Sequence, residues 1–182
     1  MSNAVQAHLG QPVSWEEWLA LGVTEERYEV VDGRLQVSAS PTRTHQFVAA
    51  NLTVLLSQAA RPHGIVIVPD VDWKLWEEPR LQVRRPDLIA VPADDIETQH
   101  PLLAVEILSP GNRGTDLIDK VSEYAKAGLD VYWIVEPEDG PEVVVYHRCG
   151  SELVEVRRYS GDQELIEESP FPVRFRPSVL SS

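Results

Sequence analysis

The spacing of apolar residues predicts three helices. In residues 44–60, and again in residues 115–127, apolar side chains recur every three or four positions, which places them on one face of a helix. A shorter helix begins at Ser14 and extends through Leu19. Ser14 and Glu17 have the spacing of a capping box, in which each side chain satisfies a free amide group at the helix start.

Shorter apolar runs with many β-branched residues predict strands between these helices. Residues 27–31 and 34–38 alternate between polar and apolar around Asp32-Gly33, which is a strong signal for a β-hairpin. The remaining strands are expected at residues 65–68, 71–76, 88–91, 102–108, 131–135, 143–147 and 153–159. The central runs are almost continuously apolar, as in strands buried on both faces. We therefore expect an α/β fold with helices flanking a mixed sheet, an N-terminal hairpin and C-terminal strands.

The domain organisation follows from the length and the lack of internal divisions. The 182 residues are enough for one sizeable core and few for two. We find no internal repeat, low-complexity segment or linker. We expect a flexible N-terminus at residues 1–13, a single domain at residues 14–170 and a C-terminal tail at residues 171–182.

Charge and composition narrow the classes of function. The chain has 16 basic and 29 acidic residues and a formal net charge of −13, which disfavours nucleic-acid binding by the whole surface but allows a local site. Cys149 is the single cysteine, so neither an internal disulfide nor a cysteine-based zinc site can form. The sequence has no secretory signal pattern and no apolar run long enough to span a bilayer. We expect a cytoplasmic protein without a membrane segment.

Two carboxylates stand out because they lie in apolar runs. Asp87 opens the run at residues 88–91, and Glu106 lies inside the run at residues 102–108. A buried carboxylate needs a partner or a metal, and neighbouring strands about 4.8 Å apart would let the two share one divalent cation. Oxygen ligands favour Mg²⁺ or Mn²⁺. The alternative is a pair of acids at strand ends, held by arginines such as Arg84 or Arg85.

The helix that follows Glu106 adds a third candidate group. Asp116, Lys120 and Glu123 are spaced so that they share one face of this helix. Because only a short loop separates the helix from the strand of Glu106, its first two turns should lie near the end of that strand. The alternative is an ordinary exposed ion pair between Lys120 and Asp116, which contributes a few tenths of a kcal/mol.

Several short blocks, in order and at compatible spacing, resemble one family. They are Arg27–Gly33, Ser40-Pro41 with His45, Arg85–Asp87, Val105–Pro110, Asp116 with Lys120 and Tyr124, and Gly128 with Tyr132–Val135. Together they resemble the Uma-two family of putative restriction endonucleases, within the PD-(D/E)xK nuclease superfamily. The resemblance implies a restriction-endonuclease-like fold and a metal-dependent endonuclease that hydrolyses DNA phosphodiester bonds.

The resemblance also implies roles for individual residues. Asp87, after Pro86, matches the first acid of the superfamily motif, and Glu106 matches the second. The superfamily lysine normally lies two residues after the second acid, where this chain has Leu108, so the family pattern points instead to Lys120 on the following helix. Glu29 matches an additional acid near the metal. Asp87 and Glu106 would then hold Mg²⁺ or Mn²⁺, with Glu29 directly or through water, and Lys120 would assist the attacking water.

Weaker signals concern the substrate, the oligomeric state and a rival function. His45 and Arg43 near the start of the long helix would meet a phosphate, although His45 is equally explained as a structural histidine. Arg85 and its neighbours would contact the DNA backbone. The resemblance further implies a homodimer. The rival is a catalytically silent nuclease-fold protein that binds nucleic acid or a protein partner, which the negative charge and Leu108 favour.

Overall fold

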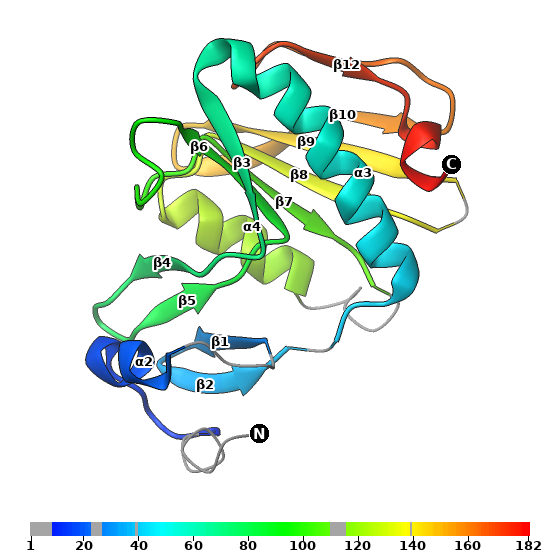
Figure 1. The fold of residues 1–182 in the computed structure, drawn as a ribbon. Coiled ribbons are helices and arrows are strands. Elements are labelled where there is room, and N and C mark those ends of the chain that lie inside the picture. Colours follow the sequence, from blue (N-terminus) through cyan, green and yellow to red (C-terminus); the bar gives the residue numbers. More distant parts are fainter. Residues whose placement is uncertain (1–8, 23–26, 39, 110–115, 139) are drawn as a thin grey trace. The chain divides into compact units, whose positions relative to one another are not determined.

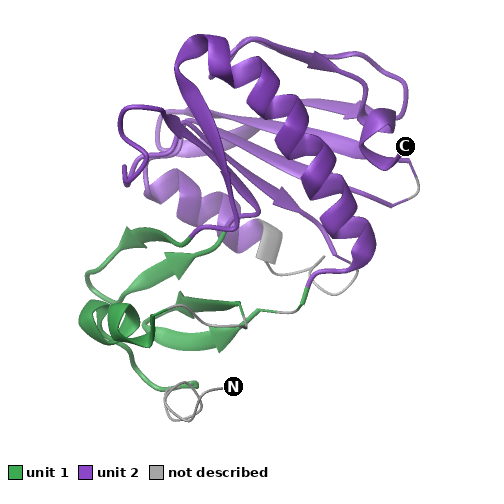
Figure 2. Ribbon diagram, in the orientation of Figure 1, with its two compact units in different colours: residues 1–40, 72–85 green, residues 41–71, 86–182 purple. Residues whose placement is uncertain are grey.

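The chain folds into two compact units (Figure 2). The structure is a computed structural model that describes residues 9–22, 27–38, 40–109, 116–138 and 140–182. Unit 1 comprises residues 1–40 and 72–85, and unit 2 comprises residues 41–71 and 86–182.

In its described residues, unit 1 is a small antiparallel sheet with the helix α2. The helix α2 spans Trp15–Leu21, and the strands, in sheet order, are β2 (Arg34–Val37), β1 (Tyr28–Val31), β5 (Gln82–Arg84) and β4 (Trp73–Trp76). The predicted capping box is present at the start of α2, where Ser14 and Glu17 exchange backbone-to-side-chain hydrogen bonds. Asp32 and Gly33 both have positive φ, as the tight turn between β1 and β2 requires.

Unit 2 is a six-stranded mixed sheet with a helix on each face (Figure 1). Its strands, in sheet order, are β10 (Glu152–Ser160), β9 (Glu142–Cys149), β8 (Val131–Glu136), β7 (Leu103–Ile107), β6 (Leu88–Pro92) and β3 (Ile65–Pro69). The α-helices among its described residues are α3 (Arg43–Ala60) and α4 (Asp116–Lys126). The parallel pair is β7 and β8, and α4 is the crossover between them. The predicted α/β class, with helices flanking a mixed sheet, is confirmed.

The core of unit 2 lies between α3 and the sheet. Val48, Leu52 and Leu56, which recur along one face of α3, are fully buried against the sheet, where Val105 and Trp133 are also fully buried. The stripe that predicted the helix is therefore the surface that fixes α3 on the sheet.

The last residues of the chain belong to this core. Residues 171–182 were expected to form a tail, but they contain strand β12 (Val173–Phe175), paired with β11 (Leu165–Glu167), and the 3₁₀ helix η2 (Pro177–Ser181). Phe175 and Leu180 are buried, and the Leu180 carbonyl accepts a hydrogen bond from Asn51 of α3. The expectation is corrected because the apolar residues of this segment join the core that α3 forms with the sheet.

Two further findings concern the N-terminus and the helices. Residues 1–8 lie outside the described residues, whereas Leu9 and Pro12 form isolated bridges with β2 and Val13 is buried. A second 3₁₀ helix, η1, spans Arg61–His63 at the end of α3. Among the described helices, none is long and apolar enough to cross a membrane.

Candidate functional site

The two carboxylates singled out in the sequence belong to neighbouring strands of the sheet in unit 2, with Glu106 in β7 and Asp87 directly before β6. β6 and β7 are antiparallel with Leu88 opposite Val105, and extending this register by one residue sets Asp87 opposite Glu106. Directly opposed side chains lie on the same face of a sheet, with their Cβ atoms about 4.5–5.5 Å apart. Asp87 and Glu106 are each 7% exposed. The two buried acids therefore lie at the same end of this antiparallel strand pair.

Asp87 is held by donors from two other elements. Its Oδ2 accepts a hydrogen bond of 2.7 Å from the Ile107 amide of β7 and is bonded at 3.0 Å to Nε2 of His45 on α3. The Asp87 carbonyl accepts a bond from the Asp70 amide, which follows β3. Because Asp87 precedes β6, these bonds connect the start of that strand to its neighbours.

Glu106 is held by two side chains of α4. Its Oε1 accepts a hydrogen bond of 2.6 Å from the Tyr124 hydroxyl and lies 3.0 Å from Nζ of Lys120. Lys120 and Tyr124 are four residues apart, so they lie one above the other on the same face of the helix. Both are buried, and Tyr124 is completely so. The crossover helix thus supplies a positive charge and a hydroxyl to the carboxylate on β7.

The orientation of Tyr124 is supported by an aromatic row. Its ring meets the edge of Tyr132 with the ring centroids 5.2 Å apart, and Tyr132 is followed by Tyr146 at 5.8 Å. Burial, and to a smaller extent the charge of Glu155, raises the pKa of the Tyr146 hydroxyl. The three rings pack in a row beside the Tyr124 hydroxyl that bonds to Glu106.

Lys120 is buried beside Glu106 and does not project into solvent. An exposed lysine paired only along its own helix would project into solvent, but Lys120 is 9% exposed and forms its ion pair with Glu106 of β7. Because both partners are buried, removing one of them should destabilise the protein more than breaking a surface ion pair would. The side chain of Asp116, the other member of the proposed surface pair, lies outside the described residues.

Glu29 and Arg85 lie in unit 1. Glu29 is buried in β1, where its carboxylate pairs with Arg84 at 3.0 Å and accepts a bond from the Arg85 amide at 3.1 Å. The Arg85 side chain pairs with Asp72 at 2.7 Å. Arg84, which was considered as a holder of the buried acids, therefore has a described partner in Glu29. The roles of Glu29 at a metal and of Arg85 at a DNA backbone stay predictions.

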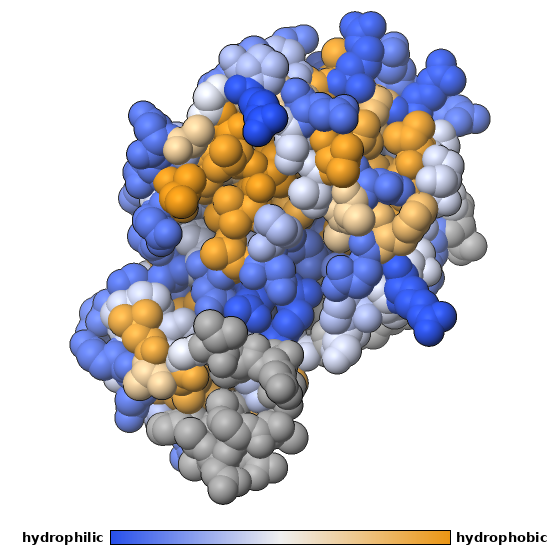
Figure 3. Space-filling model, in the orientation of Figure 1, coloured by the Kyte–Doolittle hydropathy of each residue, from blue (hydrophilic) through white to orange (hydrophobic). Residues whose placement is uncertain are grey.

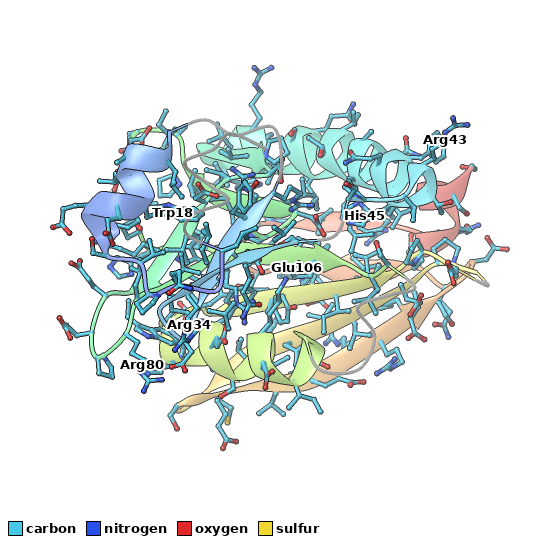
Figure 4. The ribbon with its side chains drawn as sticks, turned by 90° about the horizontal axis from the view of Figure 1, so that it is seen from below. Trp18, Arg34, Arg43, His45, Arg80 and Glu106 are labelled. Carbon is cyan, nitrogen blue, oxygen red and sulfur yellow. The ribbon has the colours of Figure 1, made fainter. Side chains whose placement is uncertain are left out.

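His45 and Arg43 have different surroundings although they are two residues apart. Arg43 is exposed, and Figure 4 shows it pointing away from Glu106, whereas His45 is on the side of α3 nearer Glu106. His45 is 4% exposed, and its ring is bonded to Asp87. This geometry favours the structural alternative for His45 over a phosphate contact. The phosphate contact of Arg43 stays a prediction.

Two contacts of this site were not anticipated from the sequence. Tyr124 was expected to be a core residue of its helix, and its hydroxyl bond to Glu106 was missed, although its spacing from Lys120 was a usable signal. The bond between His45 and Asp87 was also missed. It joins residues 42 positions apart in the chain, and no local pattern reports such a contact.

The chemistry of the donor set fits a hard divalent cation. Within the described residues, no group of three or more His, Cys, Asp or Glu side chains is arranged to hold a metal ion. Mg²⁺, however, commonly uses one or two protein carboxylates and completes its shell with water and substrate phosphate. A pair such as Asp87 and Glu106 meets that requirement, whereas structural zinc requires four ligands rich in nitrogen and sulfur.

Comparison with known proteins agrees with the fold and the family that were expected from the sequence. No functionally curated protein matches the sequence. A crystal structure of a putative nuclease belonging to DUF820 from Anabaena variabilis is similar, with 18% sequence identity and a TM-score of 0.70 over 87% of this chain and 90% of that one. The family model Uma2, described as putative restriction endonuclease, matches residues 15–180. The expected membership is confirmed, and the chain belongs to the Uma2 family of putative restriction endonucleases.

Proposed function

We propose that this protein is a Mg²⁺-dependent endonuclease that hydrolyses DNA phosphodiester bonds. The supporting observation is that two buried carboxylates, Asp87 and Glu106, lie at the same end of neighbouring strands, with a buried lysine 3.0 Å from Glu106. Membership of a nuclease family supports the same reaction class. Acids that can hold a cation, beside a lysine that can stabilise developing negative charge, are the groups that phosphodiester hydrolysis uses.

Each residue has a definite task in this proposal. Asp87 and Glu106 would hold Mg²⁺ or Mn²⁺, and the additional acid that the family resemblance implies is Glu29 of unit 1. When bound, the ion supplies Lewis-acid stabilisation to the phosphate oxygens. Lys120 donates a hydrogen bond to the attacking water and offsets the negative charge that builds on the phosphate. The contact with Glu106 keeps the ammonium at one position, which is the preorganisation that such stabilisation needs.

The second candidate is a catalytically silent nuclease-fold protein that binds nucleic acid or a protein partner. The observation in its favour is Leu108, which occupies the usual lysine position of the superfamily and is 9% exposed. The net charge of −13 also weakens long-range attraction to DNA. A cleavage assay distinguishes the candidates, because the silent protein leaves DNA intact with every cation.

The decisive experiment measures cation binding and cleavage together. Wild-type protein is expected to nick or linearise plasmid DNA with Mg²⁺ or Mn²⁺ and to stop when EDTA is added. In calorimetric titration with Mn²⁺, Asp87→Asn should bind at least about tenfold more weakly, because it loses a charged oxygen ligand.

The matched control is Asp94→Asn, an exposed acid in the loop after β6, which should bind Mn²⁺ like the wild type. Equal Mn²⁺ affinity of wild type and Asp87→Asn would refute the metal site. Mn²⁺ binding without cleavage of any DNA substrate would favour the silent alternative.

We also propose that the protein forms a homodimer. A two-fold dimer would present two sites to the two strands of a duplex. Exposed apolar side chains are compatible with a partner surface: Figure 3 shows apolar areas on the face of unit 2 that α3 crosses, and Phe47 and Val54 of α3 are about half exposed. Sedimentation at tens of micromolar protein should give the mass of a dimer, and a monomer there would contradict the proposal.

A further inference from the structure

His45 has a polar contact that the proposed mechanism does not use. We propose that His45 is a positioning residue, whose Nε2–H group holds the Asp87 carboxylate in the orientation needed for binding a divalent cation. This inference rests on the proposed metal site. It assigns His45 no direct contact with metal or DNA.

The position of His45 is set by the start of α3. Thr42 is the N-cap of this helix, and its hydroxyl oxygen accepts a hydrogen bond of 3.1 Å from the His45 amide. The cap therefore fixes the backbone of His45. Val48, one turn further along the helix, is fully buried in the core. A capped and packed helix end is a rigid support for a side chain that must hold another.

The two bonds to the Asp87 carboxylate converge on one oxygen. Oδ2 receives the Ile107 amide at 2.7 Å and the His45 ring at 3.0 Å, one donor from β7 and the other from α3. An ionised carboxylate only accepts hydrogen bonds, so with Asp87 ionised the proton of this contact is on Nε2 of His45. Two donors on different elements restrict rotation of the carboxylate more strongly than the backbone amide alone. Removing His45 would leave Asp87 less well oriented.

The other ring nitrogen of His45 supports this assignment. Nδ1 is buried and makes no hydrogen bond with any described residue. No bond of Nδ1 to a described residue therefore competes with the Asp87 contact in orienting the ring. Among the described residues, the hydrogen bond that the His45 ring makes is the one from Nε2 to Asp87. The His45 side chain is only 4% exposed and bonds to the Asp87 carboxylate. We therefore assign it the task of orienting Asp87.

Side-chain geometry supplies a discriminating set of variants. The amide nitrogen of glutamine is as many bonds from Cβ as Nε2 of histidine, so His45→Gln can still donate to Asp87. The amide of asparagine ends one bond earlier, where Nδ1 lies, so His45→Asn should not reach. His45→Met fills similar space without any donor. His63, which is exposed in η1, provides the control His63→Met.

The test is calorimetric titration of Mn²⁺ into each variant. His45→Met and His45→Asn should bind Mn²⁺ about 10–100-fold more weakly than the wild type, which is the usual effect of losing a partner of a metal ligand. His45→Gln should stay within about threefold of the wild type, and so should His63→Met. Rescue by glutamine alone separates orientation of Asp87 from a role in packing, because glutamine and methionine have similar size.

The outcomes that overturn the proposal are distinct from failure of the metal site. Unchanged Mn²⁺ affinity in His45→Met, or an equal loss in His45→Gln and His45→Met, would exclude the positioning role. Absence of Mn²⁺ binding by the wild type would refute the metal site, and the role of His45 with it. If circular dichroism shows that His45→Met is unfolded, the comparison of His45→Gln with His45→Asn decides.

A readout without metal tests the hydrogen bond itself. In nitrogen–proton correlation spectra of the metal-free wild type, the His45 ring should carry a proton on Nε2 that is protected from solvent exchange. Protection should be lost in Asp87→Ala and retained in Asp94→Asn. A His45 ring proton that is equally protected in Asp87→Ala would show that the bond is not with Asp87 and would overturn the proposal.

Discussion

Replacing Lys120 with alanine is expected to lower metal-dependent DNA cleavage by a hundredfold or more. The ammonium lies 3.0 Å from Glu106 in a buried setting, and removal of a preorganised charge or donor from such a site commonly costs that much in rate. Lys120→Arg should not restore cleavage, because the broad planar guanidinium does not replace a compact ammonium in a confined space. The measurement is the rate of plasmid cleavage at saturating Mg²⁺.

The interpretation of this result depends on the stability of the variant. Lys120 was expected to be exposed if its role were only structural, but it is buried together with Glu106. Its replacement leaves the buried Glu106 carboxylate without this cation. We therefore expect the free energy of unfolding to fall by about 3–5 kcal/mol. Cleavage should therefore be measured at a temperature where circular dichroism shows the variant folded. Lys126→Ala, at an exposed position near the end of the same helix, is the control and should retain wild-type activity. Cleavage by folded Lys120→Ala within threefold of the wild type would exclude the proposed role.

Replacing Trp133 with alanine is expected to reduce the free energy of unfolding by about 3–5 kcal/mol. Trp133 lies in the central strand β8, is completely buried, and packs with its ring centroid 6.3 Å from that of Phe175. Alanine would leave a cavity between the sheet and the C-terminal segment. The total free energy of unfolding of a domain is typically only about 5–15 kcal/mol. This loss should therefore strongly lower the urea concentration at which half of the protein is unfolded.

A matched variant separates packing from polarity at this position. The indole nitrogen of Trp133 is buried without a hydrogen bond to any described residue. Trp133→Phe removes that unpaired group while keeping an aromatic ring, so it should cost well under half as much as Trp133→Ala. Equal destabilisation by the two substitutions would show that ring packing at β8 does not account for the effect.

Where local chemistry decides the structure, the sequence was sufficient. Asp32 and Gly33 specify the hairpin because a tight turn needs two residues that tolerate positive φ. The capping box of Ser14 and Glu17, and the apolar stripe of α3, act between residues three or four positions apart. Such signals are complete within a short window, so the corresponding elements could be predicted with nearly correct ends.

Elements whose stability comes from distant partners were harder to predict. Strand β5 has three residues, of which Gln82 and Arg84 are polar yet buried, and it exists because it pairs with β1 and β4. Strand β12 and the helix after it were taken for a tail, because their apolar residues become core only once α3 is beside them. In both cases the burial that stabilises the segment is supplied by another part of the chain.

The candidate site divides in the same way. The unusual placement of Asp87 and Glu106 in apolar runs, and the spacing of Lys120 on the next helix, were visible in the sequence because a buried charge violates a strong rule. The bonds of His45 to Asp87 and of Tyr124 to Glu106 join residues 42 and 18 positions apart. Only the tertiary structure decided them, because they depend on how α3 and α4 pack on the sheet, and packing at that distance leaves no periodic pattern along the chain.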